Sequence, residues 1–282
     1  MIRAALLGSP VSHSLSPLIH NRAYEILGIT GKYEVIEVTE SEFPKFFSEA
    51  IALDAKVEWR GFSLTMPLKE IAAAHLIGVE ALAKRISSAN TVLIDRSTNE
   101  VNLRILSTDV IGFHNIFNSL SIQNDGSVAI VGGGGTARAA LAALDGLVSS
   151  IDIYQRTDKR NSLISSAVLS SEIRFHNISE LSQIASADLV INTAPSIAAQ
   201  MLLSVIPTKI KSNQVLLDVS YSPFPATPLI KWAKAGGAVI DGLELLLRQG
   251  LEQIKLMAMV SFDYEEMYRL LRSDALAVIN SR

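Results

Sequence analysis

The sequence predicts an α/β protein of two domains, and two observations lead to this expectation. Short apolar segments alternate with helix-length segments almost from end to end, which is typical of βαβ units and parallel sheets. The chain has 282 residues, and a domain usually has about 100–200, so two domains are expected rather than one. We find no internal repeat and no low-complexity tract.

The composition favours packed cores and argues against several functional classes. Hydrophobic residues make up 49% of the chain and charged residues 19%, so little disorder is expected. A net charge of −3 does not favour a nucleic-acid or acidic-lipid surface. Because there is no cysteine, disulfides and thiolate metal sites are excluded, and a reducing, cytoplasmic setting fits.

Neither a secretory signal nor a membrane helix is expected. The first apolar run is too short for a signal, and no segment approaches the ~20 apolar residues of a membrane span. We also expect no metal site, because none of the histidines lies in a metal-ligand spacing. These histidines are His13, His20, His75, His114 and His176.

Five strands and three helices are predicted in the first part of the chain. The strands lie at residues 3–8, 33–38, 59–66, 90–95 and 101–106. The helices lie at residues 16–28, 41–53 and 67–76. In the first helix we expect Ser16 as the N-cap, Pro17 as the first residue and Gly28 as the C-terminal stop. In the second, Pro44 must lie in the first turn.

The second part opens with a predicted helix at 108–120 and continues with strands separated by helices. Strands are expected at residues 128–132, 150–156, 173–177, 188–194, 215–221 and 238–242. The residues from 243 to 281 are helical in pattern, and lone helices after a sheet suggest that they cover the first domain. The chain is therefore expected to divide into 1–107, 108–240 and 241–282.

A run of four glycines between a strand and a helix indicates a dinucleotide-binding turn. The run is Gly132-Gly133-Gly134-Gly135-Thr136-Ala137, which matches G-x-G-x-x-G/A. Gly132 can take the tight turn, Gly134 lets the backbone approach a pyrophosphate, and Ala137 allows close helix–strand packing. The helix N-terminus then presents free N–H groups to phosphates. The alternative is a glycine-rich bend with no ligand.

The residues after the next strand favour NADP over NAD. The dinucleotide fingerprint expects an acid ~20 residues on, and Asp152 has that spacing, but it lies at the start of its strand and ligands bind beyond the carboxyl ends. The tip itself reads Gln155-Arg156-Thr157-Asp158-Lys159-Arg160. Arginine suits the 2′-phosphate of NADP. The alternative is a solvated basic loop, and Asp158 either repels a phosphate or caps the next helix.

Polar side chains gather at four places in the first half where strands end. The segments are Ser12–Ser16, Ser63–Lys69, Ala89–Thr91 and Ser107–Asp109. A lysine inside a helix N-terminus, as predicted for Lys69, is at the electrostatically unfavourable end, which suits a residue that transfers protons. Together these groups suit a polyhydroxylated, acidic small molecule. Each also has a structural interpretation: Ser16 and Asp109 as helix caps, Lys69 as a surface lysine, His13 and His20 as structural histidines.

These features resemble motifs of the shikimate dehydrogenase family, in the same order and over nearly the whole chain. The segments that carry the resemblance are SHSLSP (12–17), FSLTMPLKE (62–70), SANTV (88–92), STD with GF (107–113), GGGGTAR (132–138), QRT with Arg160 (155–160), VSYSPFPATPL (219–229) and DGLELLLRQG (241–250). Several motifs in matching order are far more specific than any one of them.

The resemblance implies reversible, NADPH-dependent reduction of 3-dehydroshikimate to shikimate on the route to chorismate and aromatic amino acids. It implies an N-terminal α/β substrate domain (1–107), a Rossmann-type NADP-binding domain (108–240) and C-terminal helices (241–282) that return to the substrate domain. The expected partner is a small-molecule substrate, with no nucleic acid and no membrane, for a cytoplasmic monomer or homodimer.

The resemblance also implies a role for individual residues. Lys69 and Asp109 would form the catalytic pair; which of them is the formal acid stays open. The substrate-binding residues would be Ser14, Ser16, Ser63, Thr65, Asn90, Tyr221 and Gln249. The cofactor-binding residues would be Gly132, Gly133, Gly134, Gly135, Thr136, Ala137, Gln155, Arg156, Thr157, Arg160, Thr193 and Gly242.

The chain departs from the family pattern at several positions. Ser107 and Ser63 each stand where the family has Asn, and Leu68 stands where it has His. Ile105 and Ile197 stand where Gly is expected. These departures bear on substrate range and rate more than on the reaction. The alternatives are a quinate/shikimate dehydrogenase that uses NAD or NADP, and a non-catalytic NADP-binding homologue.

Overall fold

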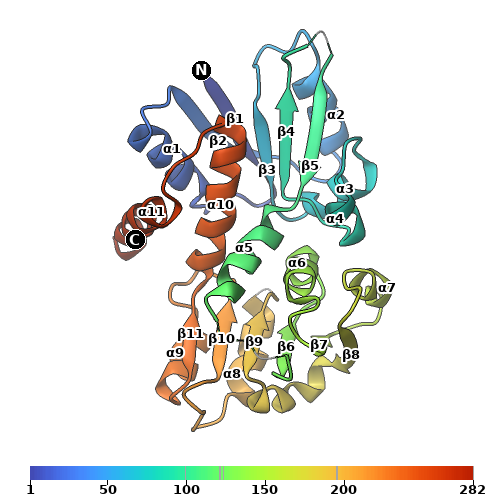
Figure 1. Ribbon diagram of the computed structural model, residues 1–282, viewed down its shortest axis with the longest axis vertical. Helices are drawn as coiled ribbons and strands as arrows, with labels where there is room; N and C mark the ends of the chain where they lie inside the picture. Colours follow the sequence, from blue (N-terminus) through green and yellow to red (C-terminus); the bar gives the residue numbers. More distant parts are fainter. Residues whose placement is uncertain (99, 121, 123, 195, 282) are drawn as a thin grey trace. The chain divides into compact units, whose positions relative to one another are not determined.

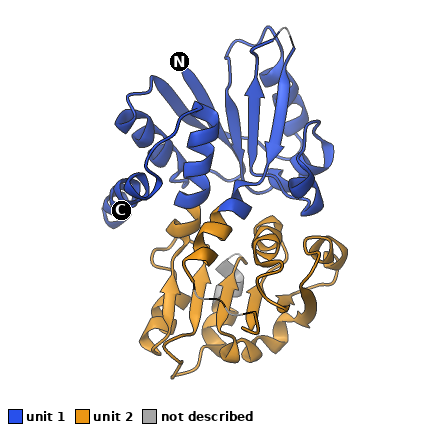
Figure 2. Ribbon diagram, viewed as in Figure 1, with its two compact units in different colours: residues 1–111, 247–282 blue, residues 112–246 orange. Residues whose placement is uncertain are grey.

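The computed structural model describes residues 1–98, 100–120, 122, 124–194 and 196–281. The chain forms two compact units, which Figure 2 distinguishes by colour. Unit 1 contains residues 1–111 and 247–282, and unit 2 contains residues 112–246. The first unit is therefore discontinuous in sequence.

Unit 1 is built on a five-stranded sheet in the order β2-β1-β3-β4-β5 (Figure 1). The strands are β1 (Ile2–Gly8), β2 (Gly31–Glu37), β3 (Gly61–Leu64), β4 (Thr91–Asp95) and β5 (Asn102–Leu106). β1 pairs in parallel with β2 and β3, but β4 is antiparallel to both of its neighbours. The expectation of parallel sheets is thus wrong here. The link from β4 to β5 is too short for the crossover of about a dozen residues that a parallel pair needs.

The helices of unit 1 begin and end close to the predicted positions, with one local correction. They include α1 (Ser16–Ile26), α2 (Phe43–Ile51), α3 (Leu68–His75) and the unpredicted α4 (Ala81–Arg85). Ser16 is the first residue of α1 and not its N-cap; Leu15 takes that place, and the Ser14 hydroxyl accepts a hydrogen bond from the Ser16 N–H. Gly28 follows the helix with φ +65°, a left-handed conformation suited to the predicted stop.

The two faces of the first sheet are covered differently, and this places the polar side chains. Phe62 and Leu64 of β3 lie in a buried apolar cluster with Phe47 of α2 and Leu68 of α3. Because side chains alternate along a strand, Ser63 points to the opposite face. A third helix covers that face, α10 (Gly242–Ala258), whose Met257 would lie 3.2 Å from a Cβ placed on Gly61.

The C-terminal helices pack on unit 1, as the predicted fold class requires. From residue 247 onward, α10 and the following α11 (Tyr264–Asn280) belong to unit 1. α11 lies against α1, where Arg22 Nε donates to Asp274 Oδ2 at 2.8 Å. The expected continuous helical tail is interrupted at residues 259–263.

Unit 2 is built on a six-stranded, all-parallel sheet in the order β11-β10-β9-β6-β7-β8. The strands are β6 (Val128–Val131), β7 (Ser150–Gln155), β8 (Glu172–Asn177), β9 (Leu189–Asn192), β10 (Val215–Asp218) and β11 (Ala238–Ile240). Counted from β6, the order is 3-2-1-4-5-6, the doubly wound arrangement of Rossmann domains. The predicted fold class is confirmed for this half, including its expected sixth strand.

The helices of unit 2 connect its strands. They are α6 (Gly135–Leu144), α7 (Asn161–Ser165), the 3₁₀ helix η1 (Ile178–Ser186), α8 (Ser196–Val205) and α9 (Thr227–Lys234). The helix before β6, α5 (Thr108–Asn118), begins in unit 1 and ends in unit 2. Within the described part of the chain, no helix is both long enough and apolar enough to cross a membrane.

His20 on α1 is buried in an aromatic environment that keeps it neutral. Its ring stacks on Tyr33 with 3.8 Å between centroids, and its side chain is 1% exposed. Burial lowers the pKa of His20 from 6.5 to about 3, although the Gln253 side chain acts in the opposite direction. Between these two pH values the unfolded chain binds a proton that the folded chain does not.

We therefore predict that His20 makes stability fall as pH drops below 6.5. A lowered pKa in the folded state contributes stability that is present above the unfolded pKa and lost below it, at up to about 1.4 kcal/mol per pH unit. Urea unfolding of wild type and His20→Gln between pH 7.5 and 5 measures this slope. The exposed histidine variant His75→Gln is the control and should keep the wild-type slope. An equal slope in His20→Gln would contradict the assignment.

Candidate active site and dinucleotide-binding turn

Four segments of unit 1 meet at one edge of its sheet. β1 and β3 are parallel and in register, with Leu7 opposite Leu64, so their carboxyl ends lie together. β4 runs the other way and begins at Thr91, which is opposite Ser63 on β3 and Leu106 on β5. The antiparallel strand thus begins at the edge where the other four strands end.

Lys69 and Asp109 form an ion pair at this edge. Each is the second residue of its helix, α3 and α5 respectively. Lys69 Nζ lies 2.6 Å from Asp109 Oδ2, and the two side chains are 18% and 5% exposed. The lysine is therefore partly accessible to solvent, while a nearly buried carboxylate fixes its position. This arrangement holds a proton donor at a defined place.

The side-chain amide of Asn90 connects the ion pair to the surrounding strands and helices. Its Nδ2 donates to Asp109 Oδ1 at 2.8 Å and to Gln249 Oε1 at 3.1 Å. Its Oδ1 accepts from the Thr108 N–H at 2.7 Å and from the hydroxyls of Thr108 and Thr91. Every polar atom of this buried amide is bonded, so Asn90 fixes the second oxygen of the Asp109 carboxylate.

Ser63 takes part in a second group of bonds, and this group was not predicted. Its hydroxyl donates to Gln253 Oε1 at 2.7 Å, and both side chains are buried. Sequence reasoning missed Gln253, as well as the hydroxyls of Thr91 and Thr108. The available signal was spacing, because Gln253 follows Gln249 by four residues and so lies on the same face of α10.

Of the predicted carboxylate-binding serines, Ser14 lies in the loop between β1 and α1, and Ser16 is the first residue of α1. Ser16 is 7% exposed and Ser14 is half-buried. The loop adjoins the segment after β3, since the Ser9 N–H donates to the Met66 carbonyl at 3.0 Å. Thr65 is half-buried at the same place, and its N–H donates to the carbonyl of Leu7 at 2.9 Å.

The glycine turn of unit 2 has the backbone geometry that a pyrophosphate site requires. Gly132 has φ +111°, and a Cβ on it would lie 2.6 Å from Thr193 Oγ1. A Cβ on Gly133 would meet Gln155 Oε1 at 2.9 Å. Gly134 caps α6, which begins at Gly135, so the helix N-terminus opens at the carboxyl end of β6. Side chains at Gly132 and Gly133 would clash, and the strand, turn and helix together fit a dinucleotide.

The tip of β7 presents the predicted cationic side chains beside this turn. Arg160 is exposed, and its guanidinium lies 3.7 Å from the position of a Cβ on Gly134. Arg156 and Thr157 are also exposed, and Gln155 Nε2 donates to Asn161 Oδ1. Asp152 lies within β7 and is bonded to His176 at 2.6 Å, which agrees with its exclusion as the ribose-binding acid.

The remaining predicted residues lie on other segments of unit 2 and at the start of α10. Thr193 follows β9, and both its N–H and its hydroxyl donate to the Val131 carbonyl at 2.9 Å. A Cβ on Gly242 would lie 2.5 Å from the Val219 carbonyl oxygen. Tyr221 is half-buried after β10 and is the one predicted ring-site residue carried by unit 2. Ile197 lies in the first turn of α8, while Pro195 of the same motif is outside the described residues.

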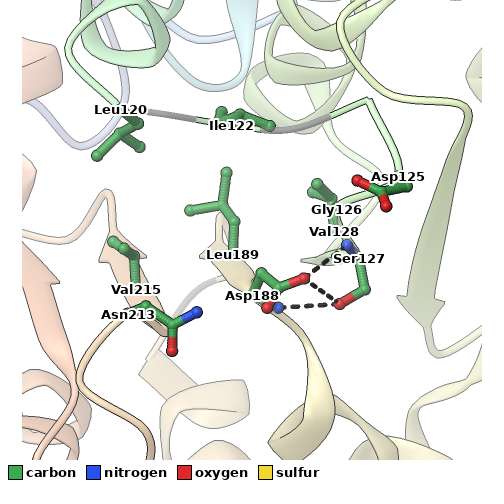
Figure 3. A pocket seen from close by; sticks show the side chains of 10 residues that line it. All are labelled: Leu120, Ile122, Asp125, Gly126, Ser127, Val128, Asp188, Leu189, Asn213 and Val215. Carbon is green, nitrogen blue, oxygen red and sulfur yellow. Dashed lines mark hydrogen bonds between the residues drawn. The ribbon is translucent and has the colours of Figure 1, made fainter.

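A cavity of about 390 Å³ lies elsewhere in unit 2, at the amino-terminal ends of the strands (Figure 3). Its polar lining includes Asp188, which accepts bonds from the N–H and the hydroxyl of Ser127 at 2.9 Å. The glycine turn follows the carboxyl end of β6, so this cavity is at the opposite edge of the sheet. None of the predicted site residues lines it. Among the residues that the structure describes, no three His, Asp or Glu side chains could hold a metal ion.

Comparison with known sequences identifies related proteins. The model described as the shikimate dehydrogenase substrate binding domain matches residues 6–92. A shikimate dehydrogenase (NADP(+)) of Streptococcus pneumoniae is 32% identical over 282 residues, which cover 95% of each chain. The enzyme of the same name from Natronomonas pharaonis is 30% identical and covers 95% of this chain and 97% of the relative.

Comparison with solved structures gives the same family. Mycobacterium tuberculosis shikimate dehydrogenase superposes with a TM-score of 0.80 at 29% identity, covering 97% of this chain and 100% of that chain. The Thermus thermophilus shikimate 5-dehydrogenase in complex with NADP(H) and shikimate has a TM-score of 0.76 at 28% identity, with the same coverage. Both likenesses extend over the whole chain.

We predict that Asn90→Ala lowers the free energy of unfolding by about 2–4 kcal/mol. The substitution leaves the Thr108 N–H and one Asp109 oxygen without this partner, and a buried unsatisfied polar group costs about 1–3 kcal/mol. Urea unfolding at pH 7.5 measures the change. The control is Asn102→Ala on β5, an exposed position where about 0.5 kcal/mol or less is expected. Equal losses in the two variants would show that Asn90 is not the centre of the cluster.

Proposed function

The chain belongs to the shikimate dehydrogenase family, and on that premise we propose how it carries out the family's reaction. It is an NADP-dependent oxidoreductase that reversibly reduces 3-dehydroshikimate to shikimate, a step toward chorismate and aromatic amino acids. The structural observation that supports this function is the ion pair of Lys69 and Asp109, which Asn90 holds at the sheet edge of unit 1.

Each unit has a separate task in this proposal. Unit 1 binds the substrate, because the hydroxyl, amide, carboxylate and ammonium groups converge at its sheet edge. Unit 2 binds NADP at the carboxyl ends of its parallel strands, the side on which doubly wound sheets bind ligands. The predicted segments 1–107 and 241–282 correspond to the first task and 108–240 to the second, with the observed change of unit falling inside α5 and α10.

NADP is held by the backbone of the glycine turn and by the tip of β7. Residues 132–137 and Thr193 would bind the pyrophosphate, helped by the free N–H groups of α6. Gln155, Arg156, Thr157 and Arg160 would bind the adenosine 2′-phosphate, for which the planar guanidinium is suited. When bound, the cofactor supplies the hydride for the carbonyl carbon of the substrate. Gly242 is assigned to the nicotinamide end by family resemblance.

Lys69 and Asp109 stabilise the charge on the substrate oxygen and transfer the proton to it. As the carbonyl is reduced, negative charge builds on its oxygen, and the Lys69 ammonium stabilises that charge and donates the proton. The Asp109 carboxylate keeps Nζ in place through its 2.6 Å contact. In the reverse reaction the Lys69–Asp109 pair accepts the proton that leaves the substrate hydroxyl. Because Asn90 holds the other carboxylate oxygen, the pair keeps its orientation without bound substrate.

The remaining predicted residues fix the substrate. Ser14 and Ser16 would bind its carboxylate with hydroxyls from the end of the β1–α1 loop and the first residue of α1. The ring hydroxyls would be bound by Ser63, Thr65, Asn90 and Gln249 of unit 1, and Tyr221 is assigned to the substrate by family resemblance. We further propose a cytoplasmic protein, a monomer or homodimer, with small molecules and neither nucleic acid nor membrane as its partners.

The reaction is tested by absorbance at the nicotinamide band, with shikimate and quinate each offered with NADP and with NAD. We expect reduction of NADP by shikimate to be the fastest of the four reactions. Faster turnover of quinate or NAD would assign the protein to the quinate-using branch. Absence of turnover in all four, with NADPH still bound, would instead identify a non-catalytic homologue.

We predict that Lys69→Ala lowers kcat about 10²–10⁴-fold while shikimate still binds, because the ammonium acts mainly on the transition-state oxygen. Steady-state kinetics and calorimetric titration with shikimate separate the two effects. Lys84→Ala, at an exposed position of α4, is the control and should match wild type. A large rise in KM with kcat unchanged would rule out the proton-donor role.

We predict that Arg160→Ala raises KM for NADP about 10–100-fold and leaves KM for NAD unchanged. A hydrogen bond to a charged group contributes about 1.5–3 kcal/mol to binding. Because NAD has no 2′-phosphate, it does not make this bond, and its KM should not depend on Arg160. Arg174→Ala, which removes an exposed arginine of β8, is the control for charge alone. A parallel rise for both cofactors would place Arg160 elsewhere on the nucleotide.

A further inference from the structure

Gln253 makes a set of buried hydrogen bonds that the proposed reaction does not use directly. Its side chain is 2% exposed on α10. Its Oε1 accepts from the Ser63 hydroxyl at 2.7 Å, and its Nε2 donates to the Asn90 carbonyl at 3.1 Å and to Thr91 Oγ1 at 2.9 Å. One amide therefore joins β3, Asn90 and the first residue of β4 to the helix.

A core position on this helix would ordinarily be apolar. Leu251 and Ile254, on either side of Gln253, are fully buried. Burying an amide costs free energy unless its polar atoms are bonded, and here the oxygen and the nitrogen both have partners. A methionine or leucine could fill this space equally well, so the hydrogen bonds and not the packing distinguish a glutamine at this position.

The bonds of Gln253 lead to the catalytic pair through two short paths. Thr91, which accepts from Gln253, donates its hydroxyl to Asn90 Oδ1 at 3.0 Å. The Asn90 carbonyl accepts from both Gln253 and the Leu64 N–H, which fixes the peptide that carries the Asn90 side chain. From there Asn90 Nδ2 reaches Asp109. Gln253 itself touches neither Lys69 nor Asp109 in the bonds described.

The residue at position 63 gives a second reason to assign Gln253 a role beyond packing. Ser63 stands where the family motif has Asn, and its hydroxyl proton is donated to Gln253. In this chain, then, the amide at this face of the sheet comes from α10 and not from β3. The departure at position 63 and the amide of residue 253 are thus joined by one hydrogen bond.

We propose that Gln253 is a positioning residue that sets Asn90, and through it the Asp109–Lys69 pair, by bonding Ser63, Thr91 and the Asn90 carbonyl at once. The proposal rests on the proposed function for its catalytic consequence. A positioning role differs from a purely structural one, because a small displacement of catalytic groups lowers the rate of the folded enzyme and not only its stability.

The kinetic test compares Gln253→Met, Thr91→Val and the double variant below their melting temperatures. Gln253→Met preserves length and removes every bond. We expect kcat with shikimate to fall about 10–100-fold, as for a misplacement of about 1 Å, with KM for NADP unchanged. The double variant should be no slower than Gln253→Met alone, because that change already interrupts the path in which Thr91 takes part. The control is Ile254→Val on the same helix, which should lower stability and leave kcat unchanged.

A crystal structure of Gln253→Met separates this inference from the proposed function. We expect the Asn90 Nδ2–Asp109 Oδ1 contact to lengthen beyond hydrogen-bond distance, whatever the enzyme turns over. An unchanged contact, or kcat unchanged despite lowered stability, would overturn the positioning role. Multiplicative losses in the double variant would overturn the path through Thr91. If the wild-type protein turns over none of the four substrate–cofactor pairs, the proposed function fails, and the crystal structure still decides the role of Gln253.

Discussion

The buried amide of Asn90 needs a partner for every polar atom, and the organisation of unit 1 meets that need. Two protons go to Asp109 and Gln249, and its oxygen accepts from Thr108 and Thr91. These partners come from α5, α10 and β4, which are far apart in sequence. Since an unpaired amide in the core is costly, these elements hold one another in place, and the same bonds orient the Asp109 carboxylate.

The mixed sheet is what makes this set of bonds possible. In an all-parallel sheet, the residues before a strand and those after a strand lie at opposite edges. β4 runs against its neighbours, so Asn90, which precedes it, comes to the edge where β1, β3 and β5 end. α10 then covers the face to which Ser63 and Thr91 point, and contributes two amides one turn apart, Gln249 and Gln253.

Unit 2 depends on close approach of backbone rather than on a buried side chain. Gly132 and Gly133 have no space for a Cβ beside Thr193 and Gln155, so the close approach of these segments requires glycine in the turn. This part of the fold could be predicted well, because a strand, a glycine run and a helix follow one another in the sequence. The basic tip of β7 could also be predicted, because these residues directly follow their strand in the sequence.

Local patterns of the sequence determined the strands, most helices, the glycine turn and the identity of the polar residues, because these follow from periodicity and from motifs of a few residues. The stop of α1 just before Gly28 and the place of Pro44 in α2 are of this kind. Only the tertiary structure decided the direction of β4 and the role of Gln253. Each of these depends on contacts between segments that are distant in the chain, and periodicity carries no information about such contacts.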